Sequence, residues 1–179
     1  MTVWAEDEHR LGLIPIHRRV WAPRGQRPTA PGVRRYQWLY VYGVVQPTTG
    51  DSWWCLLPSM RTDAMSAALA AFARDAGIDE THRVVLVWDG AGAHTSTDLL
   101  VPDGIDLVPL PPYSPELQPA ERLWPLVDEA VANRSFADLD ALEAVLVERC
   151  RTLRADRVTI HDLTCYHWWP ADAPQAIAG

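Results

Sequence analysis

A short apolar run over residues 84–88, Val-Val-Leu-Val-Trp, ends directly at Asp89. The run contains β-branched residues and no polar position, which predicts a strand that is covered on both faces of a sheet. Ligands and chemistry collect beyond the carboxyl ends of such strands. Asp89 is therefore expected at the rim of a functional site.

The other strand patterns lie mostly in the first third of the chain. They cover residues 3–8, 18–22, 38–45, 53–57 and 105–109. Alternation over residues 3–8 places Val3, Ala5 and Asp7 on one side of a sheet and their neighbours on the other. Because the turn-rich residues 47–50 join two of these runs, the early strands are expected to form an antiparallel meander.

Two longer helices are predicted from apolar stripes at helical spacing. The first covers residues 63–76, and Gly77 stands at the position that ends a helix. The second starts after Ser135 or Asp138, either of which can cap its first turn. Its apolar stripe consists of Leu139, Leu142, Val145, Leu146, Cys150 and Leu153. Shorter features are expected between the two helices, namely a helix near residues 95–100, a proline-rich loop over residues 110–119 and a helix from about Ala120.

Strands that come first, followed by helices alternating with strands, predict a mixed sheet flanked by helices. Its antiparallel meander and its parallel strands together satisfy a ribonuclease-H-like α/β architecture. The 179 residues, nearly half of them apolar, are expected to form one domain over residues 1–170. Residues 171–179 are Ala- and Pro-rich and are predicted to be a disordered tail.

The charge of the chain is divided unevenly along its length. The net charge is −7, but residues 1–50 hold seven Arg against three acids, whereas residues 51–179 hold nine Arg against twenty acids. The candidates for contacts with DNA phosphates are Arg18, Arg19, Arg24 and Arg27, in a stretch without any acid. Exposed arginines that only keep the protein soluble are the alternative interpretation.

Composition excludes several classes of protein. The start of the chain has no basic segment followed by an apolar one, and no run is long enough to cross a bilayer, so neither secretion nor membrane insertion is expected. Three cysteines at wide spacings form no metal-ligand pattern and suit a reduced cytoplasm. The protein is therefore predicted to be cytoplasmic.

Three separate segments each supply a carboxylate at the end of a predicted element: Asp7, Asp89 and Glu121. Two Mg²⁺ or Mn²⁺ ions roughly 3.5–4 Å apart cleave phosphodiesters when carboxylates hold them, and three acids are the smallest plausible set. These residues are therefore the candidates for both catalysis and metal binding. His94 is a candidate for contact with the scissile phosphate, and Trp124 is expected to hold the helix of Glu121 in the core.

Each of these residues also has a structural interpretation. Asp7 lies between two other acids, so the alternative is that it belongs to a solvated acidic strand end. For Asp89, the alternative is that its side chain caps the turn that follows the strand. Glu121 would be favoured by the helix dipole in a first helical turn. A lone histidine such as His94 is often only a hydrogen-bonding group.

The motifs around the three acids resemble those of the DDE transposases of the mariner superfamily, in its bacterial insertion-sequence branch. The stretches that carry the resemblance are Glu6-Asp7-Glu8, residues 19–25, residues 87–94 and residues 110–124. Thirty-one residues separate Asp89 from Glu121, which is near the spacing expected for that family. Gly90 and Gln118 stand where the family often has Asn.

The resemblance implies a catalytic domain that uses two Mg²⁺ or Mn²⁺ ions to cleave DNA at transposon ends and to join the strand to target DNA. It implies transposon-end and target DNA as partners, a possible homodimer, and a nucleoid-associated location. Such transposases carry N-terminal helix-turn-helix modules, and none is expected here because the first catalytic strand begins at Val3. A separate or fused polypeptide would then recognise the ends.

Two alternative functions stay open at this point. The chain is compatible with a stand-alone ribonuclease-H-like nuclease that acts on RNA–DNA hybrids or structured DNA. It is also compatible with an inactive transposase remnant that serves as a DNA-binding or dimerisation module.

Overall fold

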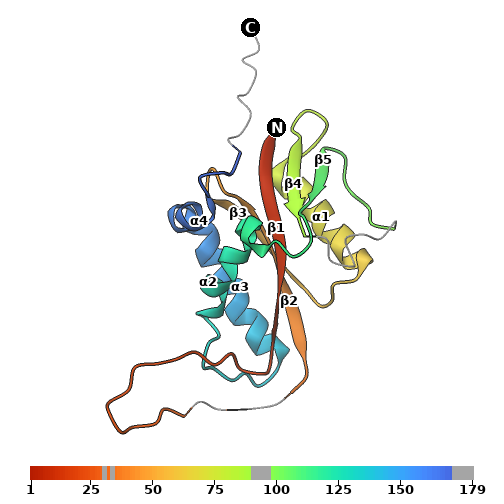
Figure 1. Cartoon of the computed structure of the whole chain (residues 1–179). Helices are drawn as coiled ribbons and strands as arrows, with labels where there is room; N and C mark the ends of the chain where they lie inside the picture. The colour runs from red at the N-terminus through yellow and green to blue at the C-terminus, as the bar shows by residue number, and fades with distance from the viewer. Residues whose placement is uncertain (30–31, 33–34, 90–97, 171–179) are drawn as a thin grey trace.

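The computed structural model describes residues 1–29, 32, 35–89 and 98–170, which form one five-stranded sheet with helices on both faces (Figure 1). The strands are β1 (Thr2–Gly12), β2 (Trp38–Gln46), β3 (Asp51–Leu57), β4 (Val84–Trp88) and β5 (Ile105–Pro109), and their order in the sheet is β3-β2-β1-β4-β5. The pairs β1–β2 and β2–β3 are antiparallel, and the pairs β1–β4 and β4–β5 are parallel. The predicted mixed sheet with an antiparallel meander is confirmed.

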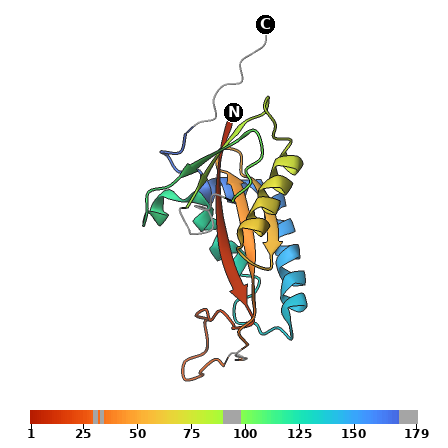
Figure 2. The ribbon, with the colours of Figure 1, turned by 90° about the vertical axis from the view of Figure 1, so that its right-hand side faces the viewer.

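The helices are α1 (Thr62–Ala76), the short 3₁₀ turns η1 (Pro115–Leu117) and η2 (Pro119–Leu123), α2 (Trp124–Asp128), α3 (Leu139–Ala155) and α4 (Arg157–Thr164). Alternation along β2 separates two cores. Tyr42 and Val44 belong to the core beneath α1, which lies in front of the strands in Figure 2. Val41 and Val45 belong to the core shared with η2, α2, α3 and α4. No helix in the described ranges combines the length and the apolar character that a bilayer span needs.

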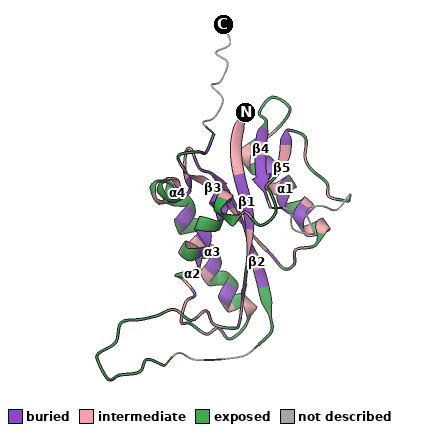
Figure 3. Ribbon diagram, viewed as in Figure 1, coloured by how far each residue is buried: buried purple, intermediate pink, exposed green. Residues whose placement is uncertain are grey.

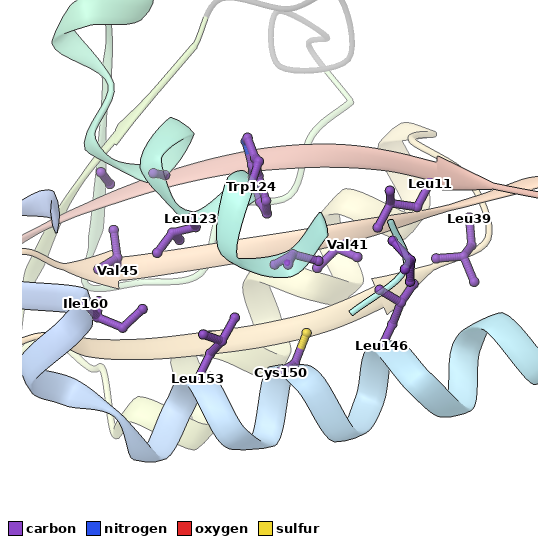
Figure 4. Packing of buried hydrophobic residues seen from close by; sticks show 14 of the residues in the cluster. Leu11, Leu39, Val41, Val45, Leu123, Trp124, Leu146, Cys150, Leu153 and Ile160 are labelled. Atoms are coloured by element: carbon purple, nitrogen blue, oxygen red, sulfur yellow. The ribbon is translucent and has the colours of Figure 1, made fainter. Parts of the chain in front are cut away.

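The core on the α3 side depends on one apolar stripe of that helix. Leu146, Cys150 and Leu153 point from α3 toward the strands (Figure 4). The stripe is aligned by the start of the helix, where the Asp138 carboxylate accepts a hydrogen bond from the backbone N–H of Ala141 at 2.9 Å. Asp138 is therefore the capping residue, and the alternative, Ser135, is not.

The predicted strand over residues 18–22 is wrong. These residues form neither strand nor helix, and they belong to the exposed segment between β1 and β2 that runs out beyond the sheet (Figures 1 and 3). Their side chains do not alternate between a buried and an exposed face, since Val20 is 55% exposed and Trp21 is fully exposed. No strand among the described residues pairs with this stretch, although its composition favours a strand.

Three further differences concern helices. The helix expected from Ala120 begins as the 3₁₀ turn η2, because Pro125 has no N–H to donate to the carbonyl of Glu121. Of the helix expected near residues 95–100, residues 98–100 are not helical and the others lie outside the described residues. Helix α4 was not predicted from the sequence. The tail expected over residues 171–179 also lies outside the described part of the chain.

The substitution Leu146→Ala tests the core on the α3 side. Leu146 is completely buried, so its truncation is expected to lower the free energy of unfolding by about 3 kcal/mol. The measurement is urea denaturation followed by circular dichroism. Glu143→Ala, on the exposed side of the same helix, serves as the control and is expected to change stability by less than about 0.5 kcal/mol. Equal losses in the two variants would show that α3 does not pack through this stripe.

Candidate functional site

The three predicted carboxylates line a single cleft of about 400 Å³ beyond the end of β4. The other described residues around it are Leu110, Pro111, Pro112, Tyr113, Ser114, Pro115 and Gln118. A larger hollow of about 1170 Å³ lies beside the start of α1 and contains none of the three acids. Size alone would favour the larger hollow, but the convergence of acids from three segments makes the smaller cleft the candidate for the chemical site.

Strand register places Asp7 and Asp89 at the same level. The last parallel pair between β1 and β4 joins Ala5 to Val87, and Asp7 and Asp89 stand two residues further along their respective strands. Beyond this pair, β1 continues and pairs with β2, with Gly43 opposite Asp7, whereas β4 ends at Trp88. The end of β4 therefore opens the sheet beside Asp7 and leaves room for a cleft.

The loop after β5 brings Glu121 to the same place. Its first residue, Leu110, donates its backbone N–H to the carbonyl of Trp88 at 2.8 Å, so the loop starts beside the end of β4. Further along, the buried Gln118 side chain donates to the carbonyl of Glu6 at 2.8 Å. These two bonds hold both ends of the proline-rich loop against the strands. Glu121, in η2, is consequently exposed at the cleft.

Asp7 is a buried carboxylate with two hydrogen-bond donors. The indole Nε1 of Trp124 donates to Oδ2 at 2.7 Å, and the backbone N–H of Glu8 donates to Oδ1 at 2.9 Å. Burial nevertheless raises the pKa of Asp7 to about 7, because it disfavours the charged form more than these bonds favour it. The nearby charge of Glu121 raises the pKa further. Asp7 therefore lies in a site with an excess of negative charge.

The two neighbours of Asp7 do not line the cleft. Glu6 is completely buried on the other side of the sheet, the side of Tyr42 and α1. Burial, and secondarily the charge of Glu6, raises the pKa of the Tyr42 hydroxyl well above its ordinary range. Of the acids at positions 6–8, only Asp7 lines the cleft, as the alternation along this strand predicted.

The donor types in the cleft suit a divalent cation, because Mg²⁺ and Mn²⁺ prefer carboxylate oxygens. Within the part of the chain that the structure describes, no three His, Cys, Asp or Glu side chains have the arrangement needed to hold a metal ion. Crowded carboxylates repel one another until a cation or a proton arrives, and the charge of Glu121 adds in this way to the larger effect of burial on the pKa of Asp7. The types of residue that line the cleft therefore fit a divalent cation.

The basic candidates lie elsewhere. Arg18 donates to the carbonyl of Pro125 at 2.9 Å and lies 3.6 Å from the carboxylate of Asp128, so its guanidinium holds the start of the exposed segment against α2. Arg19, Arg24 and Arg27 are exposed along that segment. None of these four arginines is among the described residues that line the cleft. His94 lies outside the described residues.

Sequence reasoning missed two roles in the site. Trp124 was expected to be a core residue, and it is buried, but it also donates a hydrogen bond to Asp7. Gln118 was noted only as a departure from a family pattern, yet it connects the loop to β1. A buried indole N–H needs an acceptor, which was the available signal for Trp124; the partner of Gln118 had no local signal.

The pKa of Asp7 predicts a pH dependence of stability in the metal-free protein. The pKa of Asp7 is about 7 in the folded state, against an ordinary value of 3.8. The free energy of unfolding of the wild type therefore falls as pH rises between these two values, because the folded state resists loss of the proton. Asp7→Asn removes the charge, so the stability of the variant relative to the wild type should increase by roughly 4 kcal/mol between pH 4 and pH 7 and then stay constant. Thermal denaturation in a chelator measures this difference. A pH-independent difference would contradict the raised pKa.

Comparison with known proteins identifies the family of this chain. The family model described as DDE superfamily endonuclease matches residues 2–143. An uncharacterised protein of Sinorhizobium fredii, y4pE/y4sA, is 41% identical over 104 residues, which are 58% of this chain and 76% of that protein. All three cleft carboxylates therefore lie within the residues that the family model matches.

Solved structures show the same fold. A pre-cleavage Mos1 transpososome has a TM-score of 0.60 at 14% identity, covering 93% of this chain and 57% of that one. The Mos1 mariner paired-end complex with Mn has a TM-score of 0.57 at 16% identity, covering 93% and 56%. The chain thus spans a little over half of the length of these Mos1 chains. The predicted ribonuclease-H-like fold and the predicted relationship to DDE transposases are confirmed, and the chain belongs to the DDE superfamily endonuclease family.

Proposed function

We propose that the chain is the catalytic domain of a transposase, which cleaves DNA at the ends of a transposable element and transfers the cut strand to target DNA. The observation that supports this most directly is the cleft in which Asp7, Asp89 and Glu121 meet from β1, from the end of β4 and from η2. The likeness to a DNA-bound complex, a Mos1 paired-end complex with the left transposon end, supports DNA as the substrate.

Asp7, Asp89 and Glu121 would hold two divalent cations, Mg²⁺ or Mn²⁺. These ions would supply positive charge that stabilises the attacking and the leaving oxygen of the phosphodiester. The support is the donor set of the cleft and the negative charge of Glu121, which adds to the effect of burial in raising the pKa of Asp7. Mos1 paired-end complexes with Mn and with Mg are among the structures of this fold.

The proposed reaction has two steps. In the first, water attacks the phosphorus of a phosphodiester at the transposon end, and the bond to the 3′ oxygen breaks to leave a 3′-hydroxyl and a 5′-phosphate. In the second, this 3′-hydroxyl loses its proton to solvent and its oxygen attacks a phosphodiester of the target. A P–O bond to the attacking 3′ oxygen forms, the target's own P–O3′ bond breaks, and the target 3′ oxygen leaves and takes up a proton to become a free 3′-hydroxyl. The two hydrogen bonds on Asp7 keep one carboxylate fixed, while the exposed Glu121 is free to adjust to the substrate. Positioning and charge stabilisation supply most of the rate in such reactions.

The surface that meets DNA would include the segment between β1 and β2. Arg19, Arg24 and Arg27 are exposed there in a stretch without acids, and exposed arginines suit phosphate oxygens. The excess of acids over residues 51–179 should keep the binding of non-specific DNA weak and sensitive to salt. Homodimer formation, recognition of the ends by a helix-turn-helix polypeptide, and a phosphate contact by His94 remain predictions.

The proposal is tested most cleanly at Glu121, because this side chain is exposed and its loss should not disturb the core. In a plasmid-nicking assay with Mg²⁺ or Mn²⁺, Glu121→Gln is expected to lose activity by about 100-fold or more. Glu116→Gln is the matched control, since it removes the same charge from an exposed position of the same loop that does not line the cleft. Equal activity of the two variants would remove Glu121 from the site. Preferential cleavage of an RNA–DNA hybrid would favour the stand-alone nuclease instead.

Metal binding gives a test that does not depend on turnover. Calorimetric titration with Mn²⁺ is expected to show binding to the wild type that is lost in Asp89→Ala, with a short DNA duplex strengthening the binding. Asp89 follows β4 directly and is only half buried, so the variant should keep its fold. Absence of Mn²⁺ binding to the wild type, even with DNA, would point to an inactive remnant.

A further inference from the structure

Trp124 joins the cleft to the core on the α3 side. We infer that it is a positioning residue, whose indole N–H sets the orientation of the Asp7 carboxylate and thereby the affinity of the site for divalent cations. This inference rests on the proposed function, because it assumes that Asp7 is a metal ligand.

The hydrogen bond itself is short and buried. Trp124 Nε1 lies 2.7 Å from Asp7 Oδ2, and the two residues are 6% and 7% exposed. An indole N–H is a donor only, and a bond to a carboxylate is among the stronger hydrogen bonds in proteins. Since Glu8 donates to the other oxygen, each oxygen of Asp7 has one donor, and rotation of the carboxylate would break both bonds. Each oxygen keeps lone pairs that are available to a cation.

The indole ring is held on several sides, so the direction of its N–H is determined. Gly43 stands opposite Asp7 in the sheet, and a Cβ there would lie 3.0 Å from Cη2 of Trp124. The absence of a side chain at Gly43 therefore lets the ring lie against β2. His9 stacks on the ring with centroids 5.1 Å apart, and Trp54 meets it edge-on at 6.4 Å. Figure 4 shows Trp124 beside the strands, in the same layer as Leu123.

The stacked histidine is itself held in place. His9 Nε2 lies 2.8 Å from Asp128 Oδ1, and the second oxygen of Asp128 lies 3.6 Å from Arg18. Trp124 and Asp128 are the first and last residues of α2, so this one short helix supplies both the donor to Asp7 and the partner of His9. His9 therefore holds one face of the indole, while Gly43 and Trp54 lie against its other sides.

A residue that only fills space has no need for a donor directed at an acid. Residues that hydrogen-bond to metal ligands orient them, and their loss commonly costs 10–100-fold in metal affinity or activity. The substitution Trp124→Phe keeps an aromatic ring but removes the N–H. It should leave Oδ2 of Asp7 without its donor, so that the carboxylate rotates more freely.

Trp53 provides a matched control on the other face of the sheet. It is buried in the core beneath α1, and its Nε1 donates to a carboxylate outside the cleft, Asp75 Oδ2, at 3.1 Å. Trp53→Phe therefore removes the same atoms and the same kind of hydrogen bond without touching Trp124 or Asp7. In calorimetric titrations with Mn²⁺, Trp124→Phe is expected to weaken binding 10–100-fold and Trp53→Phe by less than about threefold. The cleavage rate at sub-saturating Mn²⁺ should follow the same order.

The outcomes separate the two ideas. Wild-type affinity in Trp124→Phe would overturn the positioning role while leaving the proposed function intact. Absence of Mn²⁺ binding in the wild type would overturn the proposed function, and the inference with it. Equal losses in both variants would show a packing effect and would also overturn the inference.

A second measurement needs no folded Phe variant. In ¹H–¹⁵N spectra of the wild type, the indole resonance of Trp124 should shift during titration with Mg²⁺, in step with metal occupancy, while that of Trp53, in the core beneath α1, stays in place. Asp7→Asn should abolish the shift. A Trp124 resonance that does not move at saturating Mg²⁺ would contradict the inference.

Discussion

The candidate site depends on the parallel pairing between β1 and β4 and on the point at which it stops. Because the last pair joins Ala5 to Val87, the two strands carry Asp7 and Asp89 to the same level. β1 then continues along β2, while β4 gives way to the segment that follows Asp89. β1 therefore gives Asp7 a rigid support, and the end of β4 opens the sheet beside it, where Asp89 follows. A shift of register by one residue would turn Asp7 to the opposite face of the sheet.

The electrostatics of the cleft follow from this arrangement. Asp7 is held in a buried position where its charged form is disfavoured, and two donated hydrogen bonds only partly offset the cost. Such a group destabilises the fold at neutral pH unless positive charge is supplied. Strain of this kind is typical of functional sites, where a residue is kept in an unfavourable state by the structure around it. The hydrogen bond from Trp124 is the clearest example of that support.

Local patterns predicted most of the regular elements. They predicted all five strands of the sheet and both long helices, and they narrowed the cap of the second helix to Ser135 or Asp138, of which the structure shows Asp138. The same reasoning failed at residues 18–22, which lie outside the sheet that the described residues form. It also missed α4 and the 3₁₀ geometry of η2. The geometry of η2 follows from a local cause, the missing N–H of Pro125, whereas a strand at residues 18–22 would have needed a partner strand.

The sequence by itself determined which residue types stand at the ends of the elements, and hence the three acids, because strand period and turn residues are encoded locally. Only the tertiary structure decided that these acids meet in one cleft, and which side chains hold them there. The bonds from Trp124 to Asp7 and from Gln118 to Glu6 join residues more than a hundred positions apart. A periodic pattern in the sequence cannot reveal such partners, because they depend on how the loop, the helix and the strand pack together.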